Sequence, residues 1–200
     1  MTAPVHAAED AAAGGASQLD QFLHGLHTFS ARFEQRLLDE NDEQLDQAYG
    51  VMSLERPGKF YWHYTRPYSQ YLISDGHSLW VYDEDLQQVT VKDIGTSLEE
   101  SPAAILGGDV DVGRYYTETD LGRVDGVDTL QLTPRSSSSQ YQSIRLAFRD
   151  GGLQQMTLLD SLGQKTEIRF LDAQRNPSLD PQLFHFTPPA GVDVIDGRHE

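Results

Sequence analysis

Ser74, Asp75 and His77 have the side chains of a nucleophile, an acid and a base, the set that cleaves acyl groups in serine hydrolases. They lie around Gly76, however, and an Asp-Gly pair is typical of a two-residue hairpin turn, from which side chains point outward. The sequence contains no Gly-x-Ser-x-Gly, His-Glu-x-x-His or Gly-x-x-x-x-Gly-Lys motif. We therefore expect no catalytic residue and a protein that is not an enzyme.

The acidic residues and histidines do not have the spacing of a familiar metal site. Residues 83–85 (Asp-Glu-Asp) and 109–111 (Asp-Val-Asp) lack the glycine and the terminal glutamate of a calcium-binding EF-hand loop. His24 and His27 could share one face of a helix, but no third ligand accompanies them in the sequence. The chain has no cysteine, which removes disulfides, thiolate ligands and a lipidated N-terminal cysteine. We expect no metal ion and no cofactor.

Arg56 is a charged residue that falls in an apolar phase. It follows Met52 and Leu54 at alternate positions, so it should point toward the interior unless the next turn rotates it outward. A buried guanidinium needs several hydrogen-bond acceptors, and backbone carbonyls at the C-terminal end of a covering helix would supply them. The other interpretation is an ordinary turn arginine that is exposed to water.

Aromatic residues are concentrated in one stretch, and neighbouring residues of a strand point to opposite faces, so both faces of a sheet carry rings there. One interpretation is a well-packed core with surface tyrosines. The other is a barrel too wide for its side chains to fill, which would enclose a ligand cavity. The residues are Phe60, Tyr61, Trp62, Tyr64, Tyr68, Tyr71, Trp80 and Tyr82.

The composition indicates one acidic domain. The 200 residues suffice for a sizeable core, and 15 basic against 31 acidic residues give a formal net charge of −16. Nucleic acid is a poor partner for such a chain, and an anionic membrane surface would repel it. The charge fits either solubility in a salty habitat or a protein that handles lipid without adhering to bilayers.

The hydrophobic period predicts how these residues are positioned. Helical spacing over residues 18–28 follows Ser17, a suitable N-cap, and residues 97–108 form a second short helix with Pro102 near its start. Residues 39–46 are an acidic loop. About ten or eleven strands at this spacing predict an all-β barrel or sandwich. The strand-like runs are 29–37, 48–54, 60–64, 68–74, 78–83, 86–92, 114–119, 127–133, 141–149, 153–160 and 164–172.

The first residues resemble the end of a signal peptide. Residues 5–7 (Val-His-Ala) are similar to a cleavage site, and the apolar content of the segment is mostly alanine without a period. We expect residues 1–16 to be a disordered signal-peptide remnant and residues 17–200 to form the folded domain.

Several motifs, in order along the chain, resemble the periplasmic outer-membrane lipoprotein carrier family, LolA. The combination of the second and third motifs is specific, whereas either alone would be weak. The matching stretches are Phe29-x-Ala31-x-Phe33-x-Gln35, Arg56-Pro57-Gly58-Lys59-Phe60-x-Trp62, Ser74-Asp75-Gly76-x-x-Leu79-Trp80-x-Tyr82, Leu86-x-Gln88-Val89-Thr90, Asn176-Pro177 and Phe184-x-Phe186-x-Pro188-Pro189-x-Gly191-Val192.

The resemblance implies a mainly β protein with a few α-helices: an unclosed antiparallel half-barrel of about eleven strands covered by a helical lid. It implies a monomeric carrier in the periplasm that takes lipoproteins from an inner-membrane ABC-type lipoprotein-releasing complex. The carrier would shield the acyl chains and pass the cargo to an outer-membrane lipoprotein receptor. The family's gating arginine falls on Arg56, where it binds lid carbonyls, and the aromatic near the cavity mouth falls on Phe60.

We expect a hollow between the sheet and the helices, lined by Phe33, Leu54, Phe60, Trp62 and Ile105. The loop 39–46 is more acidic than expected for the family, which bears on partner docking. The receptor of the same fold is lipidated on an N-terminal cysteine, so a chain without cysteine is the carrier. The alternatives are a lipid-binding or lipid-sensing half-barrel that does not shuttle cargo, and a structural scaffold with a filled core.

Overall fold

The computed structural model describes residues 14–93, 102–107, 112–137 and 139–198. In these ranges twelve strands form a single sheet. The strands are β1 (Thr28–Leu38), β2 (Gln44–Glu55), β3 (Lys59–Arg66), β4 (Gln70–Asp75), β5 (Ser78–Asp83), β6 (Gln88–Asp93), β7 (Tyr116–Val124), β8 (Val127–Pro134), β9 (Tyr141–Arg149), β10 (Gly152–Asp160), β11 (Lys165–Arg175) and β12 (Asp193–Asp196).

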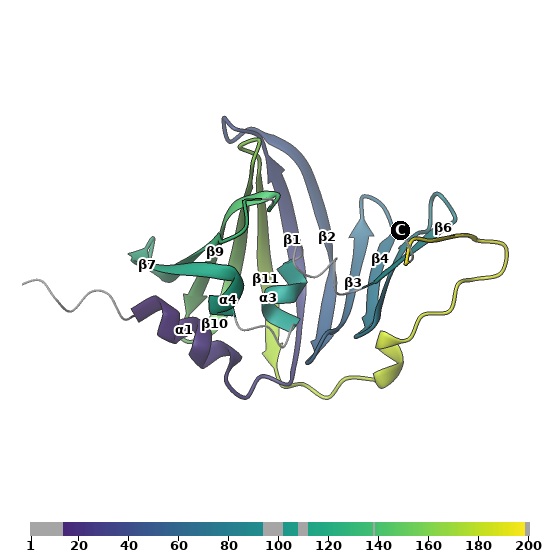
Figure 1. Ribbon diagram of the computed structural model, residues 1–200, viewed down its shortest axis with the longest axis horizontal. Helices are drawn as coiled ribbons and strands as arrows, with labels where there is room; N and C mark the ends of the chain where they lie inside the picture. Colours follow the sequence, from purple (N-terminus) through teal and green to yellow (C-terminus); the bar gives the residue numbers. More distant parts are fainter. Residues whose placement is uncertain (1–13, 94–101, 108–111, 138, 199–200) are drawn as a thin grey trace, which may run out of the picture.

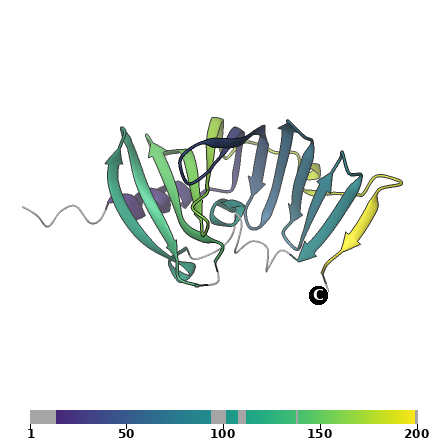
Figure 2. The same ribbon diagram turned by 90° about the horizontal axis from the view of Figure 1, so that it is seen from above.

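The sheet is an unclosed barrel, which confirms the expected fold class. Its strand order is β12-β6-β5-β4-β3-β2-β1-β11-β10-β9-β8-β7, so β7 and β12 are the two edges of the described sheet. Figure 2 shows these edge strands at opposite ends of the curved row. Twelve strands replace the expected eleven or so, because β12 adds a short parallel strand beside β6, while the other neighbouring pairs are antiparallel. Its four residues are all exposed, so no alternation marked it in the sequence.

Within the described ranges three α-helices accompany the sheet, where the sequence predicted two (Figure 1). They are α1 (Gly14–Leu23), α3 (Pro102–Gly107) and α4 (Val112–Tyr115), the last of which was not predicted, and a 3-10 turn, η2 (Pro181–Phe184), follows β11. None of the described helices is long and apolar enough to cross a membrane. Residues 1–13, most of the segment expected to be disordered, and 97–101 and 108 of the second predicted helix lie outside the described residues.

The first helix begins earlier and ends earlier than predicted. It starts at Gly14, so Ser17 is inside it and the N-cap prediction is wrong. It stops at Leu23 because Gly25 adopts a left-handed backbone conformation with φ +65°, and the N–H of Leu26 donates to the carbonyl of Leu23 (3.1 Å). Leu26 is buried, but it contributes from the turn and not from the helix.

The main core lies between the three helices and one face of the sheet. Leu19 and Phe22 of α1, Ile105 and Leu106 of α3 and Val112 of α4 belong to the same buried cluster as the inward residues of the strands. Helix α1 packs beside β7 and β8, and α3 lies against β3. The helices therefore cover the concave side of the sheet, with α1 near one edge and α3 near the middle (Figure 1).

A second, smaller core explains the aromatic rings on both faces. Tyr82, Val89 and Val91 are buried on the face of β5 and β6 that points away from Leu79 and the main core. The chain that follows β11 covers them: the ring of Phe186 lies 5.6 Å from that of Tyr82, centre to centre. Part of the aromatic excess thus packs beneath the C-terminal segment and does not face the helices.

Candidate functional site

The turn between β2 and β3 touches both covering helices. The Arg56 guanidinium donates through Nη1 to the carbonyl of Leu23, the last residue of α1 (3.3 Å). The Arg56 backbone N–H donates to the carbonyl of His27 (2.8 Å), and the Gly58 N–H donates to the carbonyl of Gly107 at the end of α3 (2.8 Å). One short turn therefore holds the C-terminal ends of two helices against the sheet.

Arg56, the residue after β2, points to the same side of the sheet as Met52 and Leu54, as its alternate position predicts. It is half-buried, two residues beyond the fully buried Leu54, and its guanidinium meets the C-terminal end of α1. Carbonyls at the end of a helix carry partial negative charge, which favours a cation there. Of the two interpretations of Arg56, this geometry fits the inward one.

A second group of bonds holds the chain directly after α1. Asn176, just after β11, donates from Nδ2 to the carbonyl of Gly25 (2.9 Å) and accepts at Oδ1 from the N–H groups of His27 (2.8 Å) and Thr28 (3.2 Å). Asn176 has φ +55°, a left-handed conformation that asparagine tolerates better than most residues. The Arg175 guanidinium donates to the carbonyl of His24, the first residue after α1. Sequence reasoning noted Asn176 only as part of a matching motif and missed this role.

The five residues expected to line a hollow lie together on the concave face. Phe33, Leu54, Phe60, Trp62 and Ile105 belong to one cluster, and none is more than 6% exposed. Strand register brings four of them together: Leu54 lies opposite Phe60, and Trp62 follows two positions later on the same face of β3. Ile105 reaches the cluster from α3. An apolar ligand can reach these side chains only if the helices move.

Gly50 lets the ring of Phe33 lie across strand β2. A Cβ atom at Gly50 would stand 2.1 Å from the carbonyl oxygen of His63 and 2.5 Å from Cζ of Phe33. The Phe33 ring is therefore free to approach Trp62, at 4.6 Å between ring centres, and Tyr64, at 5.2 Å. In the sequence, Gly50 is one position of a predicted strand, and a glycine inside a strand can signal such a close approach.

The triad-like residues of the β4–β5 hairpin serve the turn. Ser74 is fully buried and its hydroxyl donates to the carbonyl of Gly58 (2.9 Å), so the prediction that it points outward is wrong. Asp75 Oδ1 accepts from the N–H groups of His77 (2.8 Å) and Ser78 (2.9 Å). The Ser74 hydroxyl and the Asp75 carboxylate thus both bind backbone groups of the turns, which is a structural role.

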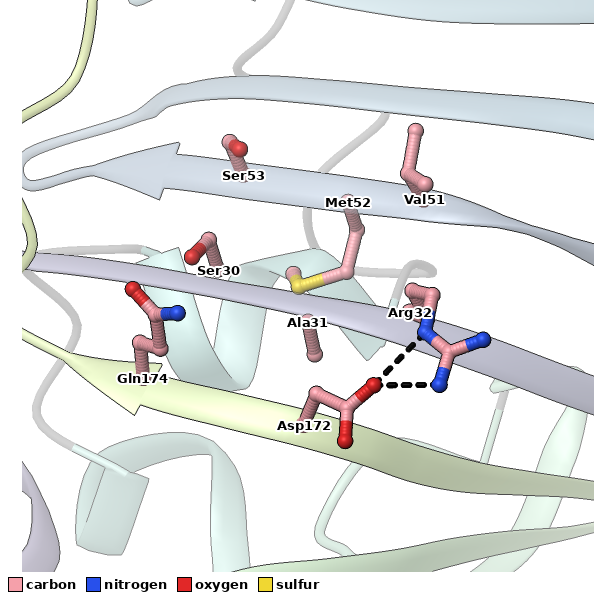
Figure 3. A pocket seen from close by; sticks show the side chains of 8 residues that line it. All are labelled: Ser30, Ala31, Arg32, Val51, Met52, Ser53, Asp172 and Gln174. Carbon is pink, nitrogen blue, oxygen red and sulfur yellow. Dashed lines mark hydrogen bonds and ion pairs between the residues drawn. The ribbon is translucent and has the colours of Figure 1, made fainter.

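The outer face of the sheet carries a separate pocket of about 290 Å³ across β11, β1 and β2 (Figure 3). Arg32 and Asp172, both exposed, form an ion pair along one side of it. The strand register shifts between Ser30 and Arg32, which loosens the pairing of β1 with β11 there. The pocket is open to solvent and an exposed ion pair borders it, so it does not enclose a hydrocarbon chain. The lining residues are Ser30, Ala31, Arg32, Val51, Met52, Ser53, Asp172 and Gln174.

Comparison with known proteins gives one consistent result. The family model described as outer membrane lipoprotein carrier protein LolA matches residues 24–187. Two proteins named outer-membrane lipoprotein carrier protein, from Dechloromonas aromatica and Chromobacterium violaceum, are each 40% identical to the chain. They align over 92% and 95% of this chain and 88% and 91% of their own lengths. The crystal structure of a LolA superfamily protein from Nitrosomonas europaea superposes with a TM-score of 0.50. It covers 86% of this chain and 97% of that one at 14% identity, so this likeness concerns the fold alone.

Proposed function

The chain belongs to the LolA family of outer membrane lipoprotein carrier proteins, and on that premise we propose that it carries lipoproteins by enclosing their acyl chains. The observation that carries the proposal is the bond between Arg56 and the end of α1, above a buried apolar cluster. Arg56 is the latch of the lid. The opened cavity is lined by Phe33, Leu54, Phe60, Trp62 and Ile105.

The proposed carrier works in the periplasm as a monomer. It receives lipoproteins from an inner-membrane ABC-type lipoprotein-releasing complex and delivers them to an outer-membrane lipoprotein receptor. It performs no chemical reaction and needs no metal ion or nucleotide, because transport consists of moving apolar chains from a weaker to a tighter binding site. Its net charge of −16 discourages adhesion to anionic bilayers during transit.

Energetics limit how completely the cargo is enclosed. Burying an acyl chain stabilises it by about 0.8 kcal/mol per CH₂ group, which amounts to on the order of 10 kcal/mol for a whole chain. Complete burial of two or three chains would approach the ceiling of non-covalent affinity and make release slow. The carrier therefore encloses its cargo incompletely, and the work of opening the lid lowers the net affinity further.

The test is release of lipoproteins from spheroplasts. Purified protein is incubated with spheroplasts whose lipoproteins carry radioactive palmitate, and the supernatant is assayed for labelled complex. We expect release by the wild-type protein and by Leu86→Gln, a change at a side chain that is 70% exposed. The comparable change at a buried residue, Ile105→Gln, should reduce release because it places an amide in the cavity. Failure of the wild-type protein to release lipoproteins would refute the proposed function.

A further inference from the structure

Trp62 carries a buried polar atom without a partner. Its side chain is 6% exposed, and among the described residues Nε1 is the buried side-chain donor for which no hydrogen-bond acceptor is found. Buried donors are nearly always paired, because leaving one unpaired forfeits its hydrogen bonds to water. An unpaired indole N–H in a buried cluster therefore needs an explanation.

The surroundings of Trp62 are apolar apart from one polar pair beside it. Phe33 lies 4.6 Å from the indole, ring centre to ring centre, and Met52 and Leu72 are its partners on the flanking strands. The Tyr64 hydroxyl donates to Gln35 Oε1 (3.1 Å). Burial raises the pKa of Tyr64 to about 12, while the polar groups of Trp62 and Gln35 beside its hydroxyl act in the opposite direction. The Tyr64 hydroxyl keeps lone pairs that face the indole, but the contact does not reach hydrogen-bond geometry, so Nε1 lacks a full acceptor in the closed state.

Resting on the carrier function proposed above, we propose that the Trp62 Nε1–H donates a hydrogen bond to an acyl carbonyl oxygen of the bound lipoprotein. An acyl chain is hydrocarbon except for the carbonyl at its head, so a single donor in an apolar lining matches a single acceptor. The bond sets how deep the chain enters, because only one depth brings the carbonyl to Nε1. In the empty, closed carrier the donor is unpaired, which raises the free energy of that state and favours loading.

The test compares chains with and without a carbonyl. The probes are a lipopeptide with two ester-linked palmitoyl chains on a glyceryl cysteine and its analogue with two ether-linked hexadecyl chains. Binding is measured by displacement of bis-ANS from the protein. Ether oxygens are poorer acceptors than ester carbonyls, so the ester peptide should bind the wild-type protein about threefold to tenfold more tightly, the value of one neutral hydrogen bond.

Trp62→Phe removes the donor and keeps an aromatic ring. In this variant the affinity for the ester peptide should fall to that for the ether peptide, while the affinity for the ether peptide stays nearly unchanged. The matched control is Trp80→Phe, because Trp80 packs against Phe186 in the second core (6.4 Å between rings) and should keep the preference. An N-palmitoyl group added to the ether peptide restores tight binding if the amide carbonyl is the acceptor.

The outcomes separate the inference from the proposed function. Equal binding of the ester and ether peptides by the wild-type protein, with no gain from the N-palmitoyl group, would overturn the role of Trp62 and leave the carrier function standing. An unchanged preference in a folded Trp62→Phe variant would overturn it too. If no lipopeptide displaces the probe, the carrier function fails, and the inference with it. The comparison of ester and ether peptides uses the wild-type protein alone, so it tests the role of Trp62 even if Trp62→Phe does not fold.

Discussion

Replacing Arg56 with leucine removes the side-chain bond to α1 and keeps the apolar volume of the side chain. The bond from Nη1 to the Leu23 carbonyl is 3.3 Å long, which exceeds the common length of about 3.0 Å. Hydrogen bonds from charged donors contribute about 1.5–3 kcal/mol, and this half-buried, long bond belongs at the lower end. A loss of about 1.5 kcal/mol raises the population of the open lid about tenfold. The backbone bond from Arg56 to His27 remains, so the turn itself should persist.

The assay has two steps: release of lipoproteins from spheroplasts, then transfer from the complex to outer membranes. Arg56→Leu should complete the first step, because an open lid admits acyl chains with fewer bonds to break. It should slow the second step about tenfold, because the carrier then holds lipid more tightly relative to the receptor. Arg56→Lys should restore transfer only partly, since an ammonium group lacks the planar fork that reaches several carbonyls.

The matched control is Arg66→Leu, the same change at an arginine whose guanidinium lies 4.5 Å from the centre of the Tyr49 ring, on the other face of the sheet. It should behave like the wild-type protein in both steps. Amide exchange supplies an independent readout: Arg56→Leu should accelerate exchange in α1 and leave the central strands unchanged. Normal transfer by Arg56→Leu, with unchanged exchange in α1, would refute the latch.

Three further predictions follow from the same geometry. Gly50→Ala should destabilise folding by about 3 kcal/mol, because the new methyl group meets the backbone of β3, whereas Gly107→Ala, with only ordinary contact, should cost less than about 1 kcal/mol in urea unfolding. Asn176→Ala should destabilise more than Asn176→Gly, since both lose three side-chain bonds but only alanine is strained at φ +55°; equal effects would contradict this reasoning. The pKa of Tyr64 is raised by burial to about 12, above its ordinary value of 10.0, so its contribution to stability is present below pH 10 and lost as the pH rises toward 12. Wild-type protein should therefore lose more stability than Tyr64→Phe between pH 10 and 11, and parallel loss would refute the assignment.

Elements with one buried face were predictable from their alternation. In β1 the apolar positions from Phe29 to Phe33 all point inward, and the predicted range 29–37 lies inside the observed Thr28–Leu38. The acidic loop is shorter than expected, since β2 already begins at Gln44 with exposed residues that show no pattern. Helix α4 is too short to display a period. The hydrophobic pattern thus located the strands that bury a face and missed short elements and strand ends with few or no buried residues.

The site was predictable only where a charged side chain occupied a position that the alternation reserves for apolar residues. Arg56 stood out because a charge occupied an apolar position, and the structure places it against a helix end. Asn176 gave no such signal, because an asparagine after a strand is also an ordinary turn residue, and its partners are about 150 positions away in the chain. Gly50 gave only the general signal of a glycine inside a strand, and the atoms that forbid a side chain there belong to other strands. These roles depend on strand pairing, which a single sequence does not specify.

The arrangement of bonds around α1 and α3 suits a carrier that must both load and release. The turn at Arg56 and Gly58 holds each helix by hydrogen bonds that each contribute on the order of 1 kcal/mol. A single acyl chain gains several times that amount by entering the cluster, so cargo can open the lid without another source of energy. In the proposed cycle, closure recovers the bonds and covers Phe33 and Leu54, which are buried in this structure. A much stronger latch would block loading, and none at all would leave lipid bound too tightly to pass on. The moderate, long bond of Arg56 lies between these limits, which is why changing this one residue should separate uptake from hand-off.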